Sequence, residues 1–372
     1  MVRSAAIFLV LISHTSLLVL SDEGLEGFFF QFLGTIGVDI FFVLSGILIG
    51  DIIYRQILAG KTSFDHFYHF FLRRWFRTLP NYYLILLVNM VIGIFVLNNL
   101  NPGTQIWKYF FFLQNFSEDQ QDFFPESWSL SIEEFSYIIG PLLLFLLLRM
   151  FSTSFSQVFL ITSLLMILTG IISRLIFYHN NEFNSILEWS HGMRKIVIYR
   201  LDSIYYGFLA IYIKYKFFNR WSRYGLKLLM TGSVLFGLTH VPLMYSYLNA
   251  HTFNYNFLIN FYLPLLLISI LFGFPFLMNL KTRNVVIKKI VSITSRISYS
   301  LYLVNYSIVF VLIARLIELE LLENTWVAIF LFWICTFVFA FMLFRFFEKP
   351  MMDLRDNPKV LRLLGISNKH HD

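Results

Sequence analysis

Apolar residues recur along this chain in runs of about 16 to 25 residues, with short polar segments between them. A helix needs roughly 20 such residues to cross a bilayer. The runs predict ten transmembrane helices, near residues 4–20, 28–54, 79–99, 127–148, 155–178, 197–213, 228–247, 257–280, 297–314 and 325–345. We therefore expect an all-α integral membrane protein, with one ten-helix domain over 1–348 and a short basic cytoplasmic tail over 349–372.

Composition supports a membrane protein and argues against other classes. Of the 372 residues, 58% are hydrophobic and 14% are charged, whereas a soluble domain carries about 25% charged residues. The single cysteine, Cys335, cannot form an intrachain disulfide or a multi-cysteine metal cluster. We expect His370 and His371 to belong to a solvated tail, so the sequence predicts no metal site.

The distribution of Lys and Arg predicts the orientation of the helices. If the N-terminus is cytoplasmic and ten helices alternate, 23 of the 29 Lys and Arg fall on the inner side and six on the outer side. Cytoplasmic loops of membrane proteins carry such an excess. We therefore expect both termini in the cytoplasm, in a multi-pass protein of the inner or plasma membrane. The net charge of +7 then reflects topology and gives no reason to expect a nucleic-acid partner.

Ionisable side chains inside the predicted helices are costly there and usually functional. The set consists of His14, Asp39, Glu133, Glu134, Arg200 and Asp202. His14 follows Arg3 by eleven residues, or about 16 Å of helix, which puts it in the outer half of the first helix. The others are expected near the midplane or in the outer part of their helices. These groups must face one another or water, so the pattern predicts a polar chamber open to the outside.

The predicted inner face is basic. Arg74 and Arg77 are three residues apart, share a helix face and stand at the cytoplasmic side of the third helix, as Arg3 does for the first. Planar guanidinium groups suit phosphate, but anchoring at lipid head groups explains the same pattern. Similarly, a histidine beside a carboxylate can act as a general base on a hydroxyl, whereas paired carboxylates also suit a proton-coupled transporter. The residue pattern leaves these functions open.

Seven polar motifs stand in order along nearly the whole chain. They are Arg3 with His14; Gly37-Val38-Asp39-Ile40-Phe41-Phe42-Val43-Leu44-Ser45-Gly46; Arg74-Trp75-Phe76-Arg77 with Pro80 and Tyr82-Tyr83; Trp128-Ser129-Leu130-Ser131-Ile132-Glu133-Glu134 with Tyr137 and Pro141; Arg200-Leu201-Asp202 with Gly207; Ser298-Tyr299-Ser300-Leu301-Tyr302-Leu303; and Glu348-Lys349-Pro350. Together they resemble the acyltransferase 3 family of membrane O-acyltransferases, which includes bacterial enzymes that acetylate O-antigens and other surface glycans.

The resemblance implies ten core helices and transfer of an acyl group, usually acetyl, from cytoplasmic acyl-CoA to a hydroxyl of an envelope glycan such as O-antigen or exopolysaccharide. It implies that His14 is the catalytic base and Glu133 the retained acid, and Asp39 is grouped with them as a catalytic residue. The implied donor site consists of Arg3, Arg74 and Arg77. Acetyl-CoA or another acyl-CoA is then a donor substrate rather than a permanently bound cofactor, and the other partners are a cell-surface or lipid-linked glycan and membrane lipid.

Further polar residues of the motifs are expected on the acceptor side or in structural roles. They are Trp128, Ser129, Glu134, Arg200, Asp202 and Asn305. Asn305 stands where the family commonly has histidine. Because asparagine forms hydrogen bonds but does not titrate, this difference weighs against a proton relay at that position.

Two alternatives remain open at this point. An enzyme with the same mechanism could transfer a succinyl group, or act on a small molecule, an antibiotic or peptidoglycan. A transporter or flippase for an envelope glycan or acyl compound would make no bond, although the spacing of the helices shows no inverted repeat of the kind found in many transporters.

Replacing His14 with Ala is expected to abolish acyl transfer without lowering the amount of protein in the membrane, because the base that activates the hydroxyl is lost. Mass spectrometry of envelope glycans measures the transfer. Full activity of His14→Ala would remove this residue from the role of base.

Overall fold

The computed structural model describes residues 1–20, 24–97, 105–120, 123–151, 153–180, 183, 185–248, 255–357 and 360 of the chain. Within these residues every regular element is a helix, so the predicted all-α class is confirmed. The first part of the predicted tail forms a short helix. The rest of that tail, from residue 361 onward, lies outside the described residues.

Eight helices of the described residues are long and apolar enough to cross a membrane. They are α2 (Leu25–Leu58), α3 (Phe64–Phe95), α5 (Ser127–Met150), α6 (Phe155–Asn180), α10 (Gly225–Leu248), α11 and α12 (Tyr255–Phe257 and Leu263–Leu277) joined by the π-helical turn Leu258–Tyr262, α13 and α14 (Val285–Val304 and Val311–Glu318) joined by the π-helical turn Asn305–Phe310, and α15 and α16 (Thr325–Leu343 and Lys349–Arg355) joined by the π-helical turn Phe344–Glu348. The shorter elements are α1 (Val2–Ser16), α4 (Ile106–Phe110), α7 (Ile186–Trp189), the π-helical turn Ser190–Arg194, the 3₁₀ turn Val197–Tyr199, α8 (Tyr205–Lys216) and α9 (Phe218–Arg223).

Two of the ten predicted transmembrane helices are shorter than expected. The first is α1, an apolar helix of 15 residues. The sixth, predicted over 197–213, is largely replaced by α8, which has 12 residues. The chain from Arg200 to Ser203 is a buried turn rather than a helix. Arg200 Nε donates to Ser203 Oγ at 2.9 Å, so the polar side chains of the turn satisfy each other.

The third helix begins earlier than predicted. α3 starts at Phe64, fifteen residues before the predicted start at 79. The hydropathy pattern misses this part because charged residues interrupt the apolar run. Arg74 and Arg77 therefore lie ten and thirteen residues inside the helix, and not at its start.

The helix α15 shows how the spans meet lipid. One face carries exposed apolar side chains at every fourth residue, at Trp326, Phe330, Ile334 and Val338. The other face is buried at Ala328, Phe332, Thr336 and Ala340. Residues four apart lie on the same side of a helix. An apolar stripe of this length suits hydrocarbon rather than water, which agrees with an integral membrane protein.

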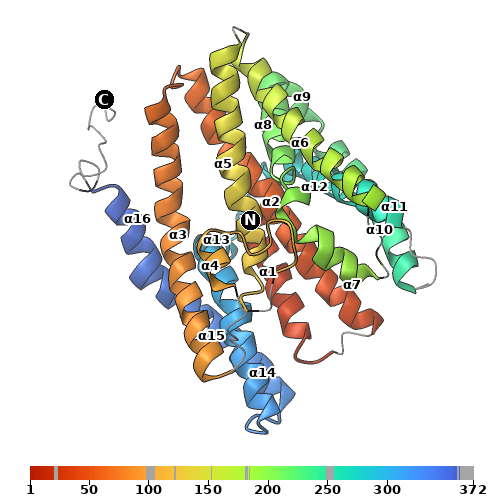
Figure 1. Cartoon of the computed structure of the whole chain (residues 1–372), viewed down its shortest axis with the longest axis vertical. Helices are drawn as coiled ribbons and strands as arrows, with labels where there is room; N and C mark the ends of the chain where they lie inside the picture. The colour runs from red at the N-terminus through yellow and green to blue at the C-terminus, as the bar shows by residue number, and fades with distance from the viewer. Residues whose placement is uncertain are drawn as a thin grey trace.

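The helices form two groups on either side of α2 and α5 (Figure 1). In one group α13 packs against α1, α3 and α15, and α16 lies along α3. In the other, α8 packs against α6 and α12, and α10 pairs with α12. The helix α2 contacts α1 in the first group and α8 in the second, while α5 contacts α3 and α6. The two central helices therefore border on both groups.

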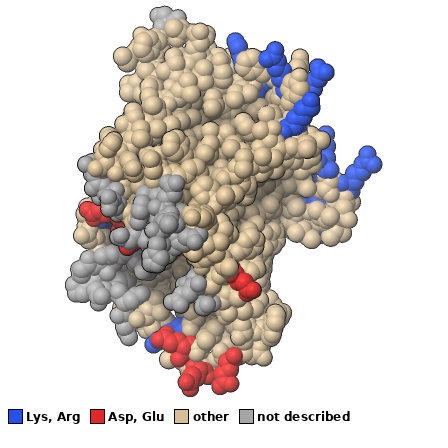
Figure 2. Space-filling view, turned by 90° about the vertical axis from the view of Figure 1, so that its right-hand side faces the viewer, with Lys and Arg blue, Asp and Glu red and all other residues tan. Residues whose placement is uncertain are grey.

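Charge is separated along the long axis of the molecule. Lys and Arg gather toward the upper end of the face in Figure 2, and most Asp and Glu lie in its lower half. The lower end includes the exposed Glu318, Glu320 and Glu323 around the turn that follows α14. This separation agrees with the predicted topology, in which most Lys and Arg lie on one side of the membrane. The assignment of the basic end to the cytoplasm stays a prediction.

Glycine allows α2 and α8 to cross in direct backbone contact. A Cβ atom added at Gly46 of α2 would overlap with the carbonyl oxygen of Ile204, and one added at Gly207 of α8 would overlap with that of Val43. Small residues at such crossings let membrane helices approach closely. This contact holds α8, and the turn that precedes it, against α2.

Replacing Gly46 with Ala is expected to lower the stability of the folded protein by about 1–3 kcal/mol, the usual cost of overpacking. The measurement is the thermal unfolding midpoint of purified protein in detergent. Gly237→Ala in α10 is the matched control, because a Cβ atom there meets nothing within 4 Å. Equal midpoints for the two variants would contradict the tight crossing.

Candidate active site

A cavity of about 510 Å³ lies among α2, α3, α5 and α13. Its volume falls in the range of about 300–1,000 Å³ that is common for small-molecule sites. Along α2 its wall runs from Val38 to Gln56, which corresponds to about 27 Å of helix. Five arginines line it: Arg3, Arg73, Arg74, Arg77 and Arg355. The cavity is therefore long and rich in positively charged groups.

Arg74 of α3 lies between two glutamates of α5. Its Nη2 donates to Glu133 Oε2 at 3.3 Å and to Glu134 Oε1 at 3.2 Å. Its Cζ is 3.2 Å from the centre of the Tyr137 ring. Glu133 and Tyr137 are four residues apart, so they occupy one face of α5. A single guanidinium thus meets two carboxylates and connects α3 with α5.

The two glutamates have different surroundings. Glu133 lines the cavity, and accepts hydrogen bonds from Ser45 Oγ at 3.4 Å and from the Tyr137 hydroxyl at 3.3 Å. Glu134 is buried and accepts from Thr78 Oγ1 at 3.3 Å. Glu133 is therefore the carboxylate that a molecule in the cavity can reach.

Two hydroxyl groups belong to the part of the cavity near the N-terminal end of α5. The Tyr302 hydroxyl and Ser129 Oγ are hydrogen-bonded to each other at 2.6 Å, and both lie within hydrogen-bonding distance of the carbonyl oxygen of Glu126, at 3.0 Å and 3.4 Å. Both side chains line the cavity. The carboxylate of Glu126 is buried, and its Oε1 accepts from Ser307 Oγ at 2.6 Å.

His14 does not line the cavity. Its Nδ1 is hydrogen-bonded to Asn305 Oδ1, and its ring is 4.7 Å from that of Tyr306. Asn305 Nδ2 donates to the carbonyl oxygens of Leu301 and Tyr302, both at 2.8 Å. Because both amide hydrogens are used, Oδ1 is an acceptor, and His14 Nδ1 carries the proton. The other ring nitrogen, Nε2, is then free to accept a proton.

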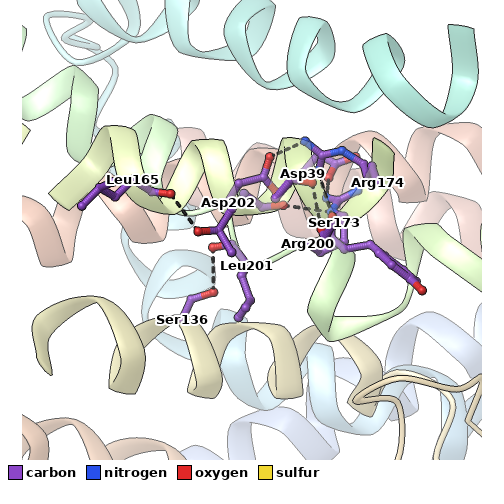
Figure 3. A network of polar contacts seen from close by, with 12 residues as sticks. Asp39, Ser136, Leu165, Ser173, Arg174, Arg200, Leu201 and Asp202 are labelled. Carbon is purple, nitrogen blue, oxygen red and sulfur yellow. Dashed lines mark hydrogen bonds and ion pairs between the residues drawn. The ribbon is translucent and has the colours of Figure 1, made fainter. Parts of the chain in front are cut away.

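Two buried ion pairs join the turn before α8 to its neighbours (Figure 3). Arg174 of α6 binds Asp202 through two hydrogen bonds of 3.0 and 2.8 Å, and also donates to the carbonyl oxygen of Tyr199 at 2.7 Å. Arg200 pairs with Asp39 of α2. All four charged side chains are fully buried.

The residues predicted as site residues therefore fall into separate places. Arg3, Arg74, Arg77, Ser129 and Glu133 line one cavity. His14 and Asn305 contact each other and do not line the cavity. Asp39 pairs with Arg200, and Asp202 with Arg174. Within the described residues, His14 has no hydrogen bond to a carboxylate.

Sequence reasoning missed three residues of these networks. Arg174 stands within the predicted helix 155–178, and the cost of a charge in a span is a signal that could have found it. Glu126 directly precedes the predicted fourth helix. Tyr302 belongs to a quoted motif, but nothing in the pattern showed that its hydroxyl meets Ser129. No cluster of His, Cys, Asp and Glu in the described residues is placed to hold a metal ion.

Comparison with known proteins gives this helical membrane fold a class. Residues 1–345 match the acyltransferase 3 family, described as an acyltransferase domain. The chain belongs to this family. The chain is also 35% identical over 130 residues to a peptidoglycan O-acetyltransferase, OatA, of Listeria monocytogenes. That match covers 31% of this chain and 20% of the Listeria protein. No solved structure matches the chain.

Replacing Asp39 with Asn is expected to destabilise the protein by about 3–5 kcal/mol, because it leaves the buried Arg200 charge without a partner. Thermal or denaturant unfolding in detergent measures the loss. Glu318→Gln is the control, since Glu318 pairs with Arg315 and its own side chain is 68% exposed, and exposed pairs contribute at most about 1 kcal/mol. If Asp39→Asn kept the wild-type stability but lost activity, Asp39 would belong to the chemistry instead.

Proposed function

We propose that this protein transfers an acetyl group from cytoplasmic acetyl-CoA to a hydroxyl of a cell-envelope glycan such as O-antigen or exopolysaccharide. The observation that carries the proposal is the arginine-lined cavity that reaches Glu133, in a chain of an acyltransferase family. The match to a peptidoglycan O-acetyltransferase adds peptidoglycan to the acceptors that deserve testing.

The cavity is the proposed donor site. Coenzyme A carries several phosphate groups, and arginine binds phosphate through paired hydrogen bonds. Arg3 and Arg77 line the cavity and have no ion-pair partner among the described residues, so they are the proposed phosphate ligands. Arg74 lines the cavity too, but both of its glutamate partners compete with a phosphate for it. We therefore propose that Arg74 mainly positions Glu133.

The proposed reaction brings a sugar hydroxyl to His14 and to the thioester of the donor in the cavity. His14 Nε2 takes the proton of the sugar hydroxyl, and the sugar oxygen bonds to the thioester carbonyl carbon. The carbon–sulfur bond then breaks, and the departing thiolate takes the proton from the imidazolium. The products are an acetyl ester and coenzyme A with a free thiol. Asn305 positions His14 by fixing the proton on Nδ1.

Glu133 has a proposed supporting role in this scheme. Glu133 is a carboxylate that lines the cavity, and it accepts hydrogen bonds from Ser45, Arg74 and Tyr137. Such a fixed carboxylate orients polar groups of the bound donor. Asp39, Arg200 and Asp202 are proposed to hold the helices together, because their charges are used by ion pairs.

Purified protein is expected to release coenzyme A from acetyl-CoA when an envelope glycan fraction is present. Arg77→Gln should raise the KM for acetyl-CoA by about tenfold or more, since a hydrogen bond to a charged group contributes about 1.5–3 kcal/mol, and should leave the KM for the glycan unchanged. Thiol release measured with a colorimetric reagent gives both constants.

Arg315→Gln is the matched control, because Arg315 is paired with the exposed Glu318 and does not line the cavity. No thiol release above background with any glycan fraction would contradict the proposed reaction. An equal effect of both substitutions on the KM for acetyl-CoA would contradict the donor site.

A further inference from the structure

Arg194 is a buried arginine that the proposed donor site does not use. It is the last residue of the π-helical turn Ser190–Arg194, and only 7% of it is exposed. Its Nε donates to Ser190 Oγ at 3.0 Å, and its Cζ is 4.9 Å from the centre of the Trp128 ring. Its Nη1 is buried without a hydrogen-bond partner among the described residues.

The backbone around Arg194 is held firmly against the start of α5. Asn115 Nδ2 donates to the carbonyl oxygens of Trp128, at 3.0 Å, and of Lys195, at 2.5 Å. The backbone of Asn115 accepts from the amide of Val197 at 2.9 Å. Asn115 therefore connects the segment that follows Arg194 with Trp128, whose ring faces the Arg194 guanidinium. The position of Arg194 is fixed by the fold.

The buried charges in this region do not balance. The carboxylate that acts most strongly on Arg194 is Asp39, which is already paired with Arg200. Asp202 is paired with Arg174 in the same way. No carboxylate of the described residues lies within ion-pairing distance of Arg194. Three arginines and two aspartates leave one positive charge, and a buried charge without a partner is costly.

Unpartnered donors in the same region point to a ligand that accepts hydrogen bonds. Arg200 Nη1 and Trp189 Nε1 are also buried without a partner among the described residues. The Trp189 ring is 5.4 Å from that of Tyr262, which in turn lies within electrostatic range of Arg194. Buried N–H groups of this kind are nearly always hydrogen-bonded in proteins. The excess charge and the free donors therefore call for the same kind of group, an anion.

Arg194 stands near the part of the cavity that the two hydroxyls line. Its guanidinium faces Trp128, which directly precedes Ser129, and Ser129 lines the cavity together with Tyr302. Tyr302 is also within electrostatic range of Arg194. Arg194 itself does not line the cavity. An anion bound by Arg194 would therefore lie outside the proposed donor site but close to the two hydroxyls.

We propose that Arg194 binds an anionic group of the acceptor, either a carboxylate or a phosphate, and so holds the acceptor close to the two hydroxyls that line the donor cavity. The proposal rests on the proposed function because it identifies the acceptor as an anionic glycan. A guanidinium suits both groups, since it offers two parallel N–H donors. The two substrates then have separate anion sites, with the donor phosphates at Arg3 and Arg77 and the acceptor anion at Arg194.

Equilibrium binding to purified protein without acetyl-CoA tests this site. Three probes separate the two possible anions: a muramyl disaccharide with its free carboxylate, the same disaccharide amidated at that carboxylate, and the amidated disaccharide linked to polyprenyl diphosphate. At least one anionic probe is expected to bind about tenfold or more tightly than the neutral disaccharide, as expected for a hydrogen-bonded charge pair. Arg194→Met is expected to remove this preference, and Arg194→Lys to keep part of it.

The matched control is Arg315→Met, which should keep the full preference because Arg315 pairs with the exposed Glu318. Equal binding of all three probes to the wild-type protein would overturn the proposal, as would a preference that survives in Arg194→Met. If Arg194→Met does not fold, the decision rests on Arg194→Lys, whose unchanged preference would also overturn it. Because no acetyl-CoA is present, the result is independent of thiol release, which tests the reaction itself.

Discussion

Three largely buried arginines of this protein, Arg74, Arg174 and Arg200, are paired with carboxylates from other segments, and these ion pairs hold the helices in register. Arg200, in the turn before α8, pairs with Asp39 of α2. Arg74 of α3 is shared by Glu133 and Glu134 of α5. Removing one member of such a pair leaves a buried ion, at a cost of several kcal/mol. The cavity lies between helices that these contacts connect, so its shape depends on them.

Arg3, Arg74, Arg77 and Glu133 line the cavity, whereas His14 does not. His14 is held by Asn305, and this contact determines which ring nitrogen can accept a proton. Asn305 can therefore support the proposed base in the way that a titrating residue would, because its role is to orient the imidazole ring of His14.

The short α8 shows why a polar site changes the regular alternation of spans. A full transmembrane helix over 197–213 would place Arg200 and Asp202 on a continuous helix surface. The observed turn instead directs Arg200 to Asp39 of α2 and Asp202 to Arg174 of α6, and Gly46 lets α2 approach this turn closely. The same segment carries Arg194 over Trp128. Irregular backbone at membrane depth is tolerated where protein buries it.

The sequence by itself determined the class of the protein and most of its spans, because apolar length and the cost of buried charge act locally along the chain. It also singled out His14 and Glu133, which the family motifs contain. Only the tertiary structure decided that Asp39 meets Arg200 rather than His14, and that Arg74 meets Glu133 within a helix that begins at Phe64. Hydropathy records whether a residue suits the membrane, but the choice of partner depends on helix packing, which brings together residues far apart in the chain.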